Sequence, residues 1–140
     1  AEVAEQIPLV IKGFAAGHPW LAKAGDYRAH YILLDNHEPG SGNVFDWRLA
    51  EHVPPGSRLI LAGGLNAGNV GAAIRRVRPF GVDVSSGVEQ STGHKDPRRI
   101  REFVQAVRAA ERELEREQEQ ARPEQVGRAA PYDWADEWSS

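Results

Sequence analysis

The stretch from Leu59 to Glu89 most constrains the fold, because it holds two short apolar runs joined by a segment of helical length. The first run, Leu59 to Ala62, is typical of a strand covered on both faces, and it stops at Gly63-Gly64. The second run, Val82 to Val84, ends in Ser85-Ser86-Gly87. Parallel strands joined by a crossover helix bring both turns to the same edge of a sheet.

Two adjacent turns rich in glycine and serine predict a phosphate cradle. Free backbone N–H groups in such turns, together with serine hydroxyls and the start of a short helix near Val88, bind an anion through dipoles. A glycine pair alone would fit an ordinary strand-to-helix turn equally well, and the second turn favours the cradle. The predicted phosphate-binding residues are Gly63, Gly64, Leu65, Ser85, Ser86 and Gly87.

The rest of the chain alternates strand-like and helix-like segments, which predicts parallel strands and an α/β fold. The expected strands are Leu9 to Phe14, Tyr31 to Leu34, Leu59 to Ala62 and Val82 to Val84. The expected helical segments lie around Trp20 to Ala22, from Phe45 until Pro54-Pro55 ends the helix, from Asn66 or Ala67 to Val77, and over 96–120.

The composition excludes several classes of function. A net charge of −3 with a pI near 6.0 gives no reason to expect a nucleic-acid partner. The chain has no cysteine, hence no disulfide frame, and its five histidines share no metal-ligand spacing. Without an apolar run of about 18 residues or a signal-peptide pattern at the start, we expect no membrane span and a cytoplasmic setting.

Two aspartates lie at the carboxyl ends of expected strands, where α/β proteins place their ligands. Asp35 ends the apolar run Tyr31 to Leu34, and partial burial there favours the protonated form that a general acid needs. A cap for the following turn, shared with Asn36, is the alternative. Asp83 occupies the same kind of position near Ser85, and it could bind ligand hydroxyls or be neutralised by Lys12.

These residues resemble the phosphoribosylanthranilate isomerase family of tryptophan biosynthesis. The blocks that carry the resemblance occur in the family's order: LLDN with GSGNVFDW at 33–47, LILAGGLNAGNV at 59–70, RPFGVDVSSGVE at 78–89 and GHKDPRRIREFVQAVR at 93–108. The family fold is a (β/α)8 TIM barrel, and this chain matches its last four βα units, a half barrel. The loop at 40–47 departs from the family by lacking its lysine and threonine.

The resemblance implies a cofactor-free Amadori rearrangement of N-(5-phosphoribosyl)anthranilate to 1-(2-carboxyphenylamino)-1-deoxyribulose 5-phosphate. Asp35 falls on the general acid that protonates the ribose ring oxygen, and Asp83 falls on the acid that contacts the sugar. The family's base is a cysteine at the end of its first strand, a region without a counterpart here. We therefore expect catalysis to need an N-terminal half and the isolated chain to be inactive.

The expected binding partners follow from the family resemblance. They are a phosphorylated sugar, and either a second chain or N-terminal half that completes the barrel, or a second copy in a homodimer. We expect residues 1–110 to form the half barrel and 111–140 a polar helix extension and an aromatic tail. A non-catalytic phosphate-binding or assembly module, and another phosphosugar barrel isomerase, remain as alternatives.

Overall fold

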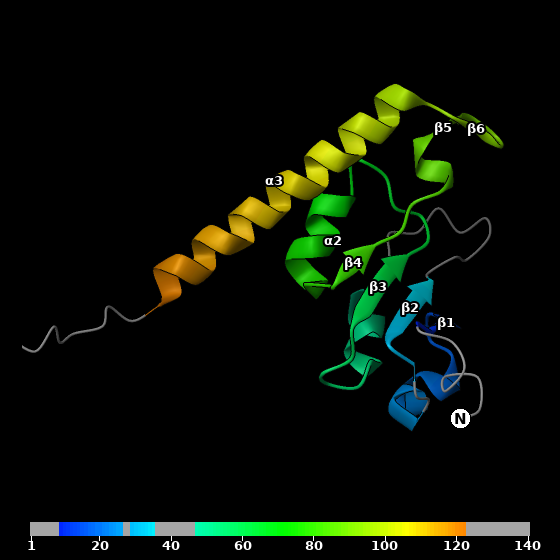
Figure 1. The fold of residues 1–140 in the computed structure, drawn as a ribbon, viewed down its shortest axis with the longest axis vertical. Coiled ribbons are helices and arrows are strands. Elements are labelled where there is room, and N and C mark those ends of the chain that lie inside the picture. Colours follow the sequence, from blue (N-terminus) through cyan, green and yellow to red (C-terminus); the bar gives the residue numbers. More distant parts are fainter. Residues whose placement is uncertain (1–8, 27–28, 36–46, 123–140) are drawn as a thin grey trace, which may run out of the picture.

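A computed structural model of the chain describes residues 9–26, 29–35 and 47–122 (Figure 1). Its strands are β1 (Ile11–Ala15), β2 (Tyr31–Asp35), β3 (Leu59–Ala62), β4 (Gly81–Val82), β5 (Glu89–Ser91) and β6 (His94–Lys95). Its helices are the 3-10 helices η1 (Pro19–Asp26), η2 (Trp47–His52) and η3 (Ser86–Val88) and the α-helices α2 (Val70–Val77) and α3 (Pro97–Ala121). Residues 40–46 of the loop at 40–47, and residues 123–140, which include the expected aromatic tail, lie outside the described residues.

The main sheet has four parallel strands in the order β1-β2-β3-β4, so each strand pairs with its neighbour in the sequence. This confirms the predicted parallel α/β arrangement. Side chains alternate across the sheet, and Phe14, Leu34 and Leu61, which lie in one register row, are all buried on one face. The sheet core therefore follows directly from the apolar runs.

The α-helices cover this buried face. Val70, Ala73 and Ile74 of α2 and Phe103 and Ala110 of α3 belong to the same apolar core as the strands. Figure 1 shows α3 lying across α2, with its C-terminal turns running on past α2. α3 is continuous through residue 110, so the predicted division into a half barrel and a polar extension falls inside one helix.

The opposite face is less covered by the described residues. Leu33 and Ile60 are only partly buried there, and Ile11 on β1 is 50% exposed. The prediction that Leu59 to Ala62 is covered on both faces is thus too strong for Ile60, whose side chain is only partly buried.

Several predicted bounds are wrong for local reasons. α2 begins at Val70, because the Asn66 side chain accepts hydrogen bonds from the N–H groups of Gly68 (2.8 Å) and Asn69 (3.1 Å) and so holds 66–69 in a turn. β4 ends at Val82, so Asp83 lies just beyond the strand. The N–H of Asp83 donates to the Leu61 carbonyl at 2.8 Å.

The region after β4 also differs from expectation. The short helix predicted to start near Val88 is η3, which ends there and is a single 3-10 turn. The antiparallel hairpin β5–β6 was not predicted, and its turn contains Gly93 at a φ of 79°. The segment predicted as a helix from Phe45 forms the 3-10 helix η2 over Trp47–His52, and Phe45 itself lies outside the described residues.

Candidate functional site

The carboxyl ends of β2, β3 and β4 surround one hollow of about 340 Å³. Because the strands are parallel, their C-terminal residues share one edge of the sheet. Asp35 is in register with Ala62, and one further step of the β3–β4 register places Asp83 beside Ala62. The lining residues are Asp35, Ala62, Gly63, Gly64, Leu65, Asp83, Val84, Ser85 and Ser86.

The structure therefore brings together around the hollow every residue predicted for the site except Gly87, which follows Ser86 and is not one of the lining residues. A Cβ atom built on Gly87 would lie 1.8 Å from the Leu65 carbonyl oxygen and 3.2 Å from the Asn66 Cα atom. Only a residue without a side chain lets the two turns approach this closely. Gly87 thus acts as the contact point of the two turns.

Asp35 is the acid that enters the hollow from β2. Its Oδ1 atom is buried and has no hydrogen-bond partner among the residues that the structure describes. Buried polar atoms are usually paired, so an unpaired carboxylate oxygen is typical of a group kept ready for a ligand. The Oδ1 atom accepts no hydrogen bond from the described part of the chain, so it caps no backbone N–H group there.

Asp83 lies two strands from Asp35 along the same edge, a separation of about 10 Å at the usual strand spacing. It is exposed at the rim, in contrast to Asp35. Lys12, the suggested neutralising partner of Asp83, lies on β1, at the opposite edge of the sheet from β4. The sheet order gives that pairing no support.

The first turn is shaped by backbone and asparagine contacts. Gly63 and Gly64 adopt φ values of 87° and 66°, which other residues rarely adopt. The Asn69 side chain fixes this turn, because its Nδ2 donates to the Gly64 carbonyl at 2.9 Å and its Oδ1 accepts from the Asn66 N–H at 2.8 Å. In the described part of the chain, the N–H groups of Gly64 and Leu65 have no acceptor, so they are available to an anion.

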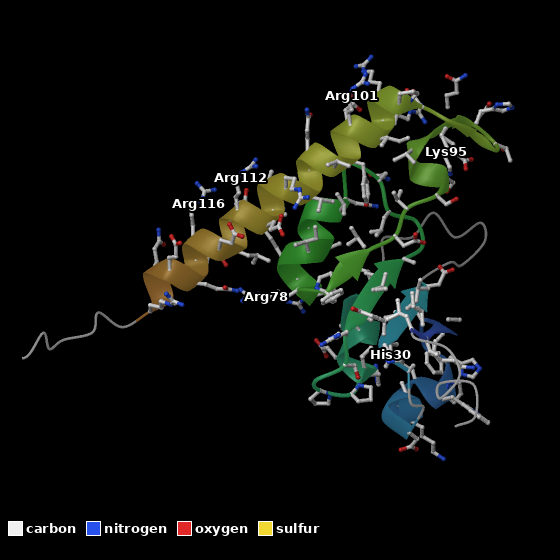
Figure 2. The ribbon with its side chains drawn as sticks, in the orientation of Figure 1. His30, Arg78, Lys95, Arg101, Arg112 and Arg116 are labelled. Carbon is white, nitrogen blue, oxygen red and sulfur yellow. The ribbon has the colours of Figure 1, made fainter. Side chains whose placement is uncertain are left out.

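The second turn is held by a lysine. Lys95 Nζ donates to the Ser85 carbonyl at 3.0 Å, to the Ser85 Oγ at 3.3 Å and to Glu89 Oε1 at 2.7 Å. Lys95 belongs to β6, and Figure 2 labels it at the β5–β6 hairpin. The Lys95 ammonium and the N–H of Gly93, which donates at 3.0 Å, lower the pKa of the Glu89 carboxyl.

Sequence reasoning missed Asn66, Asn69 and Lys95 as residues that shape the site. The two asparagines were visible as a pair three residues apart between glycines, a pattern typical of side-chain to backbone turns. Lys95 belongs to the GHKD block, but no role was predicted for it. The feature of the sequence that could have indicated a role is its position directly before Asp96-Pro97. Asp96 caps α3 by accepting from the Arg98 N–H at 2.9 Å.

The described residues contain no cluster of three or more metal-ligating side chains. None of the helices in the described ranges is both long enough and apolar enough to cross a membrane.

Sequential parallel strands, helices on one face and a hollow at the carboxyl ends of the strands define a TIM-barrel-type α/β protein. Solved structures agree. The structure of mutually generated monomers of dimeric phosphoribosylanthranilate isomerase from Thermotoga maritima superposes with a TM-score of 0.61 at 39% identity, over 77% of this chain and 53% of that one. A phosphoribosylanthranilate isomerase in complex with reduced 1-(o-carboxyphenylamino)-1-deoxyribulose 5-phosphate gives 0.59 at 39% identity, over 77% and 52%.

The particular family follows from the sequence. The model of the N-(5'-phosphoribosyl)anthranilate (PRA) isomerase family matches residues 4–106, and the chain belongs to this family. The N-(5'-phosphoribosyl)anthranilate isomerase of Desulforudis audaxviator is 50% identical over 108 residues, which are 72% of this chain and 52% of that protein. The chain thus spans about half the length of the curated relative.

Proposed function

We propose that this chain supplies the acid and the phosphate-binding part of a phosphoribosylanthranilate isomerase of tryptophan biosynthesis. The observation that carries the proposal is the shared hollow, which Asp35 lines together with the glycine and serine turns, and whose Asp35 has a buried Oδ1 atom without a hydrogen-bond partner among the described residues. One ligand that carries both a phosphate and a sugar ring oxygen fits such a site. The substrate is N-(5-phosphoribosyl)anthranilate.

The proposed chemistry begins with proton transfer from Asp35 to the ribose ring oxygen, which opens the ring to a Schiff base. Loss of a proton from the adjacent sugar carbon then gives the aminodeoxyribulose phosphate after tautomerisation. The phosphate is held by the N–H groups of Gly64 and Leu65 on one side and by Ser85, Ser86 and Gly87 on the other. Asp83, exposed at the rim, contacts the sugar hydroxyls. No cofactor enters these steps.

The second step needs a base from outside these residues. The 140 residues contain no cysteine, the residue that serves as base in the family. The half-covered face of the sheet, with Ile11, Leu33 and Ile60, also calls for a further layer. We therefore propose a half barrel that is completed by an N-terminal half, by a second chain or by a second copy, and that works in the cytoplasm.

The test is isomerase activity on N-(5-phosphoribosyl)anthranilate, measured by product fluorescence, for the 140-residue chain alone and after addition of a polypeptide carrying the first four family strands. We expect no turnover alone and turnover after addition. In the reconstituted enzyme, Asp35→Asn should lower kcat by at least about 100-fold, since general acid catalysis contributes on that order. Asp26→Asn, an exposed aspartate at the end of η1, is the matched control.

The outcome also separates the alternatives. Phosphate binding without activity in any reconstitution would favour a non-catalytic binding module. Activity on a different aminophosphosugar, with none on the anthranilate compound, would favour another barrel isomerase. Full activity of Asp35→Asn would show that the acid is a different residue.

A further inference from the structure

Lys95 makes contacts that neither the family assignment nor the proposed chemistry explains. Its Nζ lies within hydrogen-bond distance of three acceptors, namely the Ser85 carbonyl, the Ser85 Oγ and Glu89 Oε1. A lysine ammonium has three donors and no acceptor, so these contacts use all of its hydrogens. Lys95 is therefore fully engaged next to the serine turn, although its side chain is 46% exposed.

The direction of these hydrogen bonds fixes the polarity of the Ser85 hydroxyl. Since Lys95 can only donate, the Ser85 Oγ must be the acceptor at 3.3 Å. The hydroxyl hydrogen then points away from Lys95. Ser85 lines the hollow, and phosphate oxygens of a dianion only accept, so the hydroxyl is left with the polarity that a phosphate requires.

Glu89 holds the lysine in place. Its Oε1 accepts from Lys95 at 2.7 Å and its Oε2 accepts from the Gly93 N–H at 3.0 Å, so the carboxylate is fixed between the lysine and the β5–β6 turn. The Glu89 side chain is only 13% exposed. The carboxylate also neutralises the charge of Lys95. Lys95 therefore attracts distant anions only weakly, but it still donates hydrogen bonds to groups that it contacts.

We propose that Lys95 is a positioning residue that sets the Ser85 hydroxyl as a hydrogen-bond donor to the phosphate of the ligand, with Glu89 as its anchor. This inference rests on the proposed function, because it assumes that the hollow binds a phosphate. It predicts that Lys95 acts through Ser85, which separates it from a lysine that attracts phosphate by its charge alone.

The test is a double-mutant cycle on the 140-residue chain, with inorganic phosphate as the probe and amide chemical shifts in NMR titrations as the readout. Lys95→Met and Ser85→Ala should each weaken phosphate binding about tenfold, and the double variant should bind no more weakly than Ser85→Ala. Lys23→Met removes the same charge from an exposed lysine in η1 and should leave binding unchanged.

Each outcome is decisive. Equal weakening by Lys95→Met in the presence and absence of the Ser85 hydroxyl would overturn the inference, as would no weakening at all. Failure of the unsubstituted chain to bind phosphate would contradict the proposed function itself, and this role with it. If the unsubstituted chain binds phosphate and Lys95→Met binds it equally well, the inference about Lys95 is contradicted but the proposed function is not.

A second measurement does not depend on whether the variants fold. In the unsubstituted chain, the Lys95 ammonium should give a slowly exchanging ¹⁵N signal, because all three of its hydrogens are bonded. An ammonium that exchanges as fast as that of the exposed Lys23 would refute the arrangement.

Discussion

Gly87→Ala tests the close approach of the two turns most directly. The added methyl group would lie 1.8 Å from the Leu65 carbonyl oxygen and 2.9 Å from its carbonyl carbon. Carbon to carbonyl oxygen contacts are about 3.3 Å or longer, so the turns must separate by about 1.5 Å. Both contacting groups are backbone, so no side-chain rotation relieves the clash.

The expected magnitudes follow from this displacement. Overpacking of this kind costs about 1–3 kcal/mol of unfolding free energy, and the backbone clash places Gly87→Ala at the upper end. Misplacement of a binding group by about 1 Å costs on the order of 100-fold in a positioned reaction, so phosphate affinity should fall by at least about tenfold. Urea unfolding and an NMR phosphate titration measure the two effects on the same samples.

Gly13→Ala is the matched control, because a Cβ atom on Gly13 meets nothing within 4 Å and its backbone is not left-handed. The same substitution there should be neutral or stabilise by up to about 1 kcal/mol, through the entropy of the unfolded chain. If Gly87→Ala unfolds at the same urea concentration as Gly13→Ala and binds phosphate equally well, the turns do not depend on this contact.

Four further outcomes follow from other contacts. Asp35→Asn should raise the unfolding free energy by about 1 kcal/mol in urea, because it removes the charge from a carboxylate with an unpaired buried oxygen, and a loss of stability would contradict this. Because the pKa of Glu89 is lowered, its pair with Lys95 stabilises the fold above the ordinary glutamate pKa of about 4.3, and this contribution is lost as the pH falls through the lowered pKa. Glu89→Gln should therefore reduce the loss of stability at acid pH. An unchanged loss would contradict a stabilising role for this pair. Asp96→Ala should cost about 1 kcal/mol in thermal unfolding through loss of the α3 cap, whereas Asp26→Ala should cost almost nothing. Leu61→Ala, at a fully buried position, should cost about 2–5 kcal/mol in urea, and a cost below about 1 kcal/mol would show that the sheet face is not the core.

The parallel sheet and most of the site could be predicted because their signals are local. An apolar run followed by Gly63-Gly64 or by Ser85-Ser86 defines both a strand and the turn after it, and parallel pairing then brings the turns together. Asp35 could be singled out for the same reason, as a charged residue at the end of an apolar strand. These signals require no knowledge of distant contacts.

The remaining features depend on contacts across the turns, which periodicity does not contain. α2 begins later than the apolar periodicity predicts, because Asn66 competes with the helix for backbone hydrogen bonds. The roles of Lys95 and Gly87 arise from partners ten or more positions away, Ser85 and Leu65 respectively. In the sequence, nothing distinguishes Gly87 and Lys95 from other glycines and lysines. Their roles are visible only when the two turns are seen in contact.

The sequential order of the main sheet has a consequence for how the chain acquires its structure. Because every strand of this sheet pairs with its neighbour in the sequence, each pairing closes one connection only, and the entropy lost on a closure grows only slowly with the length of that connection. The two turns that meet at Leu65 and Gly87 are closed by the single helix α2 between them. The anion-binding half of the site can therefore form early in folding, before the more distant strands are in place.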